Sequence, residues 1–276
     1  MKERRPILRK ALLYFALVVG AIIFAYPFVW MFFASFKPEL ELDRLALLPE
    51  HWTAESFRLV FRSIPIGRAF LNSVVVAIGV TASALVFGSG AAYALAKLRW
   101  RGRDAVFNLI LFTMMVPSLV LLIPLYTLIV SFGWTDSLVG LIVPAMMNAT
   151  AVLILRQSFV TLPDSMLDAA RMDGCGELRI LFSIVWPLSI PALVTAGIIV
   201  FIGNWNEVLW PLMVIRKEEV MTMPQMVALF AVGGGAEGKL GPRLASALLL
   251  SVPVILAYLV FQRHFISSLA STGSKG

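Results

Sequence analysis

Six long apolar blocks, separated by polar segments, dominate the pattern of the chain. A helix that crosses a bilayer needs about 20 mainly apolar residues, and each block is close to that length or exceeds it. The expected spanning helices cover residues 11–34, 70–96, 105–130, 138–155, 190–215 and 244–261. Prolines within these blocks do not exclude them, because neighbouring helices can support a kink in the membrane. The pattern predicts an all-α polytopic membrane protein with one transmembrane domain over residues 1–276.

A polar stretch of about thirty residues, from Leu162 to Pro191, separates the fourth and fifth blocks. Pro163 is suited to the first turn of a helix, where its missing N–H is not needed, and Gly174 is suited to the position that follows a helix. A second helix is expected from about Glu177, and we expect it to end before Pro187. The stretch therefore predicts two short helices joined by a glycine turn.

Composition excludes a water-soluble fold. The chain is 59% hydrophobic and 14% charged, whereas soluble domains are about 45–50% apolar and about 25% charged. The single cysteine, Cys175, excludes an internal disulfide. The basic N-terminus resembles the start of a signal peptide, but the apolar run 11–36 is longer than the usual 7–15 residues of such a signal. We expect an uncleaved first span.

The net charge of +7 could suggest nucleic acid as a partner, but the distribution of the charges indicates membrane topology instead. With six spans and the N-terminus inside, fourteen of the 23 Lys and Arg residues fall in inner segments. They are densest at the N-terminus and in the segment 97–103, close to span ends, where basic residues orient membrane proteins most strongly. Both termini and the polar hairpin are therefore predicted to be cytoplasmic.

The hairpin resembles the EAA loop of ABC importer permeases. The family pattern Glu-Ala-Ala-x3-Gly-x9-Ile-x-Leu-Pro aligns without a gap on Asp168-Ala169-Ala170, Gly174, Ile184 and Trp186-Pro187. Asp168 replaces Glu and Trp186 replaces Leu. The alternative is an ordinary helical hairpin between two spans. The resemblance implies that the cytoplasmic loop 156–189 couples to an ATPase through Asp168, Ala169, Ala170, Arg171, Asp173, Gly174 and Glu177. Small side chains at Ala169 and Ala170 would let the partner's backbone approach closely.

The fifth apolar block ends in a segment that resembles the Trp-Asn-Glu motif of the carbohydrate, maltose-type subfamily. Glu207 is the only charged residue within the predicted spans, and such residues are functional by default. Asn204, Asn206 and Glu207 are therefore candidates for the translocation path. The alternative for Glu207 is packing or anchoring near the outer interface, beside Trp205 and Trp210. Other segments also resemble features of the permease family: Phe70–Ser73, Ala91–Ala96 and Met114–Tyr126. The end of the chain resembles the family ending, which Phe265, Leu269, Lys275 and Gly276 match, whereas Ser268 and Thr272 replace glycines.

Two polar segments are predicted to lie on the outer side of the membrane. Residues 37–68 are expected to form a small structured loop on the membrane, the alternative being a separate domain. In the segment 232–243, Gly233, Gly238 and Lys239 fit a phosphate-binding loop, but Leu240 replaces the Ser or Thr that holds magnesium, so no nucleotide site is expected. The resemblance instead implies that a docked binding protein touches Gly234, Gly235 and Glu237. His51 and His264 look isolated from other metal ligands, so no metal site is predicted.

The combined expectation is a carbohydrate-type ABC importer permease in the inner or plasma membrane, without catalytic residues. The resemblance implies a heterodimer with a second permease, two ATPase subunits that bind ATP and magnesium, an extracytoplasmic solute-binding protein, and no cofactor on this chain. A secondary transporter is the main alternative, but the spans lack the midplane carboxylates that coupling ions need. An integral-membrane enzyme would need clustered polar residues, which are not visible. The motifs are shared by sugar, polyol and glycerol-phosphate importers, so they do not identify the solute.

Overall fold

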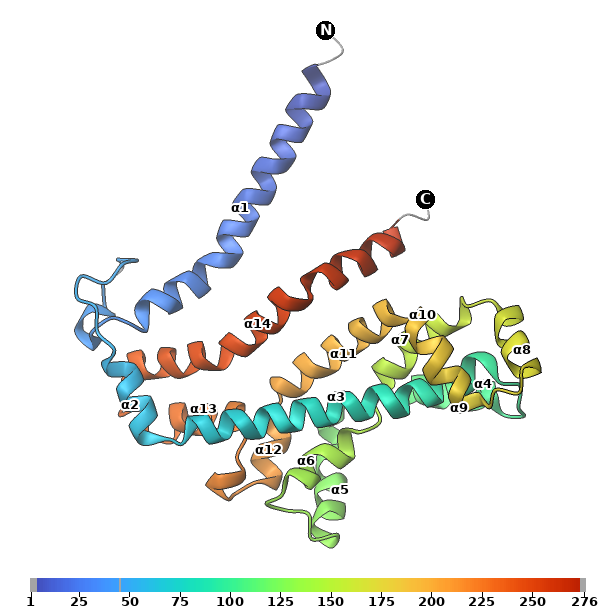
Figure 1. Cartoon of the computed structure of the whole chain (residues 1–276). Coiled ribbons are helices and arrows are strands. Elements are labelled where there is room, and N and C mark those ends of the chain that lie inside the picture. Colours follow the sequence, from blue (N-terminus) through green and yellow to red (C-terminus); the bar gives the residue numbers. More distant parts are fainter. Residues whose placement is uncertain (1–3, 45, 274–276) are drawn as a thin grey trace. The chain divides into compact units, whose positions relative to one another are not determined.

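The computed structural model describes residues 4–44 and 46–273, which leaves the matches at Lys275 and Gly276 outside the described residues. All regular structure within these two ranges is helical, as predicted (Figure 1). The chain divides into two compact units. Unit 1 comprises Met1–Ile66 and Val227–Val252, and unit 2 comprises Gly67–Met226 and Pro253–Gly276. Three helices are longer than thirty residues: α1 (Arg4–Ala34), α3 (Ile66–Lys97) and α14 (Leu240–Gly273).

Unit 1 joins the first outer segment to the beginning of α14. That segment contains the short helices η1 (Glu39–Glu41) and α2 (Glu55–Ser63), and α13 (Met223–Val232) ends within the same unit. The Glu39 carboxylate accepts hydrogen bonds from the N–H groups of Leu240 at 2.5 Å and Gly241 at 3.0 Å. A carboxylate satisfies the free N–H groups at a helix N-terminus and is favoured there by the helix dipole. Glu39 therefore caps α14.

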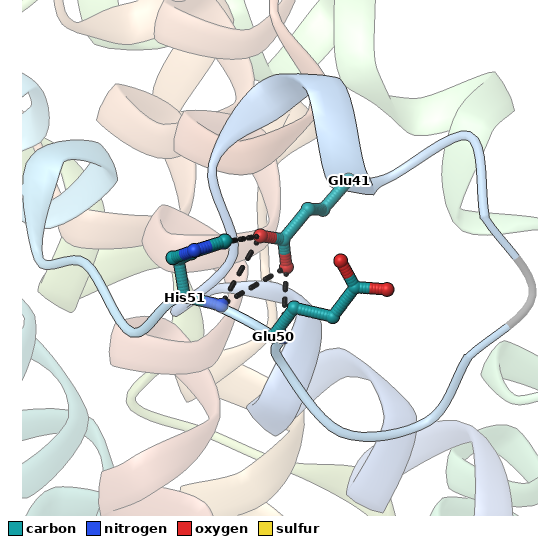
Figure 2. A group of neighbouring side chains, drawn as sticks. All are labelled: Glu41, Glu50 and His51. Atoms are coloured by element: carbon teal, nitrogen blue, oxygen red, sulfur yellow. Dashed lines mark hydrogen bonds and ion pairs between the residues drawn. The ribbon is translucent and has the colours of Figure 1, made fainter.

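The prediction that His51 is isolated is wrong. Glu41, which is 8% exposed, accepts bonds from the N–H of Glu50 at 3.0 Å and of His51 at 3.1 Å. The Nδ1 atom of His51 lies 2.8 Å from the same carboxylate, as Figure 2 shows. Glu41 and His51 are ten positions apart, and the loop between them folds back so that they meet. Their contact therefore could not be recognised from the short spacing that is typical of metal ligands. The two backbone bonds to Glu41 hold the ends of this loop together, which gives the cluster a structural role.

Unit 2 is built around a core to which α3, α7 (Ala149–Val160) and α11 (Ile190–Trp205) all contribute. Val80, Leu155 and Ala196 are fully enclosed members of this core, one from each helix. Helix α11 packs on α7, and α4 (Arg103–Thr113) packs on the same helix. The remaining helices of this unit are α5 (Ser118–Ser131), α6 (Leu138–Ile142), η2 (Val143–Ala145), α8 (Asp164–Met172), α9 (Glu177–Ile180), η3 (Leu181–Val185), α10 (Trp186–Leu188), α12 (Leu209–Val214) and η4 (Glu218–Val220).

Three apolar stretches are long enough to cross a membrane as they stand: Leu12–Ala34, Ile66–Lys97 and Leu138–Val160. Two others are bent pairs, α4 with α5 at 101° and Glu177–Leu188 with α11 at 89°. The bend before α5 coincides with Pro117, which lacks an N–H and disfavours helical geometry at the residue before it. Of the last block, Leu240–Leu256 forms a shorter apolar helix. The described residues thus hold three helices that can cross a membrane, or up to five if each bent pair is one span, and the count of six stays a prediction.

The predicted span 190–215 is not one helix. Helix α11 ends at Trp205, and α12 begins at Leu209 and packs on α5 and α6. The break falls at the polar residues Asn206 and Glu207, whose side chains bond to the backbone and so compete with the helical hydrogen bonds. The stretch Leu138–Val160 also changes from α6 to the tighter turn η2 around Pro144 before α7 begins, although it still counts as one candidate span.

Candidate functional site

Helix α8 carries the first half of the predicted hairpin and ends at Met172, so that Gly174 follows the cap residue Asp173 as the expected turn glycine. The φ angle of Gly174 is +78°, a left-handed conformation that glycine adopts without strain. The N–H of Gly174 bonds to the carbonyl of Arg171 and the N–H of Cys175 bonds to that of Ala170, each at 3.0 Å. This pair of bonds is the Schellman pattern, which satisfies the last carbonyls of a helix and turns the chain back.

The second half of the hairpin differs from the expectation that a helix ends before Pro187. The helical stretch runs from Glu177 to Leu188, with a π-helical turn, η3, over Leu181–Val185. Pro187 lies in the first turn of α10, directly after this π turn, where the N–H that proline lacks is not needed. Trp186, the departure from the family pattern, donates its indole N–H to the Ser89 hydroxyl of α3 at 2.9 Å. The larger side chain therefore adds a bond between the hairpin and α3.

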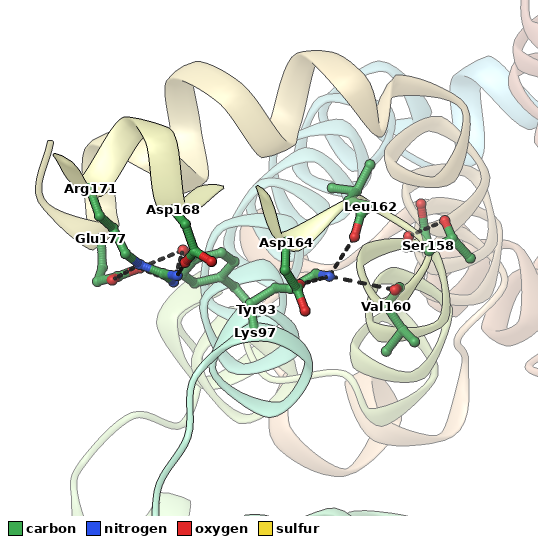
Figure 3. Close-up of polar contacts among 10 residues, drawn as sticks. Tyr93, Lys97, Ser158, Val160, Leu162, Asp164, Asp168, Arg171 and Glu177 are labelled. Atoms are coloured by element: carbon green, nitrogen blue, oxygen red, sulfur yellow. Dashed lines mark hydrogen bonds and ion pairs between the residues drawn. The ribbon is translucent and has the colours of Figure 1, made fainter. Parts of the chain in front are cut away.

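Arg171 joins the two halves of the hairpin. Its Nε atom lies 2.8 Å from Glu177 Oε1 and its Nη1 atom lies 2.7 Å from Asp168 Oδ1, as Figure 3 shows. The hydrogen bond to Glu177 raises the pKa of the guanidinium, although partial burial opposes this. The hydroxyl of Tyr93, on α3, donates a hydrogen bond to Glu177. Three of the seven predicted coupling residues are thus brought together.

Lys97 holds the other end of α8. Its ammonium group, on a side chain only 4% exposed, donates to Asp164 Oδ1 at 2.6 Å and to the carbonyl of Leu162 at 2.6 Å (Figure 3). The hydrogen bond from Lys97 lowers the pKa of Asp164. Tyr93 and Lys97 lie four residues apart at the end of α3, hence on one helix face. This pair was not predicted from the sequence, although two polar residues four positions apart at the end of an apolar helix are a recognisable signal.

The exposed surface of the hairpin includes apolar side chains. Ala169 is exposed, but Ala170 is buried within the chain itself, so only one of the two alanines offers a bare surface. Met172 is 88% exposed and Leu178 is 73% exposed. Exposed apolar side chains that lie next to one another can form a surface for a partner protein. The hairpin presents an apolar knob, here defined as Ala169, Met172 and Leu178.

Two of the three residues predicted for the translocation path line a cavity of about 560 Å³ in unit 2. They are Asn204 and Glu207. Glu207 also accepts a bond from the N–H of Trp210 at 3.1 Å, which caps α12. Asn206 does not line the cavity, and its amide donates to the carbonyl of Ile202 instead. The last turn of α11 and the break after it therefore present Asn204 and Glu207 to the cavity.

The loop between α13 and α14 carries the three residues predicted to meet a binding protein. Gly234 and Glu237 have positive φ angles, +85° and +51°. Glu237 forms an ion pair of 2.8 Å with Lys239 and lines a pocket of about 500 Å³ in unit 1. Gly234 and Gly235 do not line it. Because Glu39 already occupies the N-terminus of α14, the position where a phosphate-binding loop holds its anion is taken.

The family model for the inner membrane component of binding-protein-dependent transport systems matches residues 84–270, more than half of the chain. The matched range contains the hairpin, the cavity and the break between α11 and α12. The chain belongs to this family. Members of this family of inner membrane components are permease subunits rather than enzymes, which confirms the prediction of an ABC importer permease in a membrane.

Relatives of this inner membrane component match along nearly the whole chain. The arabinooligosaccharides transport system permease protein AraQ of Bacillus subtilis is 34% identical and covers 93% of this chain and 92% of its own length. The trehalose transport system permease protein SugB of Mycobacterium tuberculosis is 33% identical, with coverages of 94% and 95%. The sn-glycerol-3-phosphate permease protein UgpE of Brucella abortus is 30% identical, with both coverages at 99%.

A solved structure supports the same assignment. A chain from the crystal structure of a bacterial ABC transporter involved in the import of the acidic polysaccharide alginate superposes with a TM-score of 0.81. That chain is 26% identical, and the match covers 96% of this inner membrane component and 99% of the other chain. Permeases of this kind work with another permease, an ATPase and a binding protein. These relatives do not support the alternative of a secondary transporter.

Proposed function

We propose that this permease forms half of the translocation path of an importer for a carbohydrate or a related polyol or sugar phosphate. Its partners are a second, different permease subunit, two ATPase subunits and an extracytoplasmic solute-binding protein. The relatives named for arabinooligosaccharides, trehalose and glycerol phosphate support this class of solute. ATP and magnesium are bound by the ATPase subunits, and this chain binds no cofactor.

The observation that carries the proposal is an exposed apolar knob on a rigidly held hairpin. Ala169, Met172 and Leu178 are uncovered by the described chain. Both ends of α8 are bonded to α3, because Asp164 accepts from Lys97 and Arg171 donates to the hydroxyl of Tyr93 at 3.5 Å. An ATPase that binds the knob would move α8, and the bonds would pass the displacement to α3. The loop 156–189 would then couple ATP hydrolysis to a change of access.

The 560 Å³ cavity is the proposed part of the path within this subunit. Pockets that bind small molecules span about 300–1,000 Å³ and combine apolar walls with a few polar groups. Leucine side chains form much of the wall here, and Asn204 and Glu207 supply hydrogen-bonding groups that suit a hydroxyl-rich solute. We therefore propose Asn204 and Glu207 as path residues. For Asn206 we propose only a local role, in which its side chain bonds to the backbone of α11.

The proposed orientation places both termini and the hairpin in the cytoplasm. In a chain whose Cys175 is replaced by Ala, we expect Val232→Cys to react with an impermeant thiol reagent in intact cells. Arg101→Cys should react only after the membrane is permeabilised. Both native side chains are exposed, and Val232 is 89% exposed. Equal labelling of the two positions in intact cells would contradict this orientation.

The function is tested by reconstituting the permease with its second subunit, ATPase and binding protein in liposomes. We expect ATP hydrolysis to rise when the binding protein is loaded with its sugar, and the labelled sugar to accumulate inside. Trehalose, arabinooligosaccharides and glycerol 3-phosphate are the first candidates, each added with its cognate binding protein. An ATPase rate that does not respond to any loaded binding protein would contradict the importer function.

A further inference from the structure

A second, much smaller cavity adjoins the 560 Å³ cavity in unit 2. This chamber has a volume of about 20 Å³ and shares Leu141, Asn204, Glu207 and Trp210 with the larger one. Its remaining polar lining comes from Ser73 of α3 and from Thr222, both 4% exposed. The chamber thus lies directly behind the carboxylate and amide that the larger cavity presents.

Thr222 directly precedes α13, where a threonine hydroxyl usually accepts a bond from a backbone N–H of the first turn. Here the hydroxyl of Ser73 accepts the bond from the N–H of Met223 at 2.7 Å. The adjacent Asn72 donates to the carbonyls of Glu219 and Met221, each at 3.0 Å, which fixes the approach to Thr222. Within the described part of the chain, the buried Oγ1 of Thr222 has no hydrogen-bond partner.

We propose that the chamber binds one water molecule, which bridges the hydroxyl of Thr222 to Asn204 and Glu207. A single water needs at least about 10–15 Å³ of such space and two to four polar partners, and the chamber meets both conditions. Buried polar groups nearly always have a partner, either in the protein or in ordered water. The Ser73 hydroxyl, which already accepts the N–H of Met223, lines the same chamber and has a second lone pair that can accept from the water.

A hard metal cation fits the chamber less well than water. Cations such as calcium or magnesium take six or more oxygen ligands, whereas four side chains offer oxygen here. One oxygen of Glu207 already accepts the N–H of Trp210 at the start of α12. The partial positive charge at the N-terminus of α12 also disfavours a cation beside it.

The bound water makes Thr222 and Ser73 positioning residues for the proposed path. Asn204 and Glu207 each face both cavities, so a water held behind them restricts the orientations that they present to a solute. Occupancy of the chamber does not depend on the proposed function. The effect on solute affinity rests on it.

The first test is direct observation of the water. In a high-resolution map of the assembled importer, we expect a density peak within hydrogen-bond distance of Thr222 Oγ1. The peak should be retained in Thr222→Ser, which keeps the hydroxyl, and lost in Thr222→Val, which keeps the branched shape. A wild-type map with ordered side chains and no peak, or with Thr222 bonded to a protein atom, would overturn the proposal even if the Val variant failed to assemble.

The second test separates positioning from folding. Thr222→Val should raise the KM for the transported sugar roughly 2- to 10-fold, the range expected from the loss of one hydrogen bond. The basal ATP hydrolysis and the yield of the complex should stay at wild-type values, and Thr222→Ser should restore the KM. An unchanged KM in a Val variant that has lost the water would overturn the positioning role. Absence of any sugar transport by the wild-type complex would instead reject the proposed function and leave the water site standing.

Discussion

Met172→Glu should abolish the stimulation of ATP hydrolysis by the solute-loaded binding protein. Met172 is 88% exposed, and an exposed substitution changes the stability of the chain by no more than about 0.5 kcal/mol. At an interface with the ATPase the same charge would be buried without a partner. Disruption of a central interface residue costs about 2 kcal/mol or more, which corresponds to roughly a 30-fold loss of affinity. Co-purification of the ATPase and stimulated hydrolysis measure this loss.

Ser165→Glu is the matched control for Met172→Glu. Ser165 is also exposed and lies on the same short helix, α8, so it receives the same charge outside the apolar knob. Its first-turn position favours a negative charge, and we expect normal assembly and transport. If Met172→Glu, at wild-type abundance, matched this control in both assays, the hairpin would be a linker rather than a coupling element.

Gly140→Ala should destabilise the permease severely. A Cβ atom at this position would lie 2.3 Å from the carbonyl oxygen of Trp134 and 3.2 Å from a methyl group of Val214. The carbonyl of Gly140 also accepts the indole N–H of Trp210 at 3.1 Å, in the wall of the cavity. Overpacking of a tight core costs about 1–3 kcal/mol. We expect a lower melting temperature of the solubilised protein and a reduced yield in the membrane.

Gly90→Ala controls for the general effect of adding a methyl group. Gly90 lies within α3, and its added Cβ would have no heavy atom within 4 Å. Alanine also forms helices better than glycine, so the melting temperature should stay the same or rise. Equal melting temperatures for Gly140→Ala and the wild type would show that α6 can move away from Trp134 without cost.

The parts of the fold that depend on local chemistry could be predicted from the sequence. Long apolar blocks identified a polytopic helical protein, and Gly174 marked the turn after α8 because glycine adopts the left-handed conformation without strain. The interruptions were missed. Proline and polar side chains near 117, 144 and 206 allow a bend, but whether a helix breaks depends on what packs against it.

The contacts that organise the candidate site could not be predicted, because they join residues far apart in sequence. Tyr93 and Glu177 are separated by 84 positions, and no local pattern links them. The same reason explains Ala170: the spacing shows a small residue, but only the packing of α8 decides whether that residue faces a partner or the chain itself. His51 lies beside Glu41 only because the loop between them closes.

The bond between Glu39 and the start of α14 bears on how the protein is made. The two partners are 201 positions apart, and chains are synthesised at about 5–20 residues per second. Roughly 10–40 seconds therefore pass between the emergence of Glu39 and that of Leu240. Throughout that interval the first outer segment has been translated without the helix that it caps. Unit 1 can close only near the end of translation, once Val227–Val252 has been made.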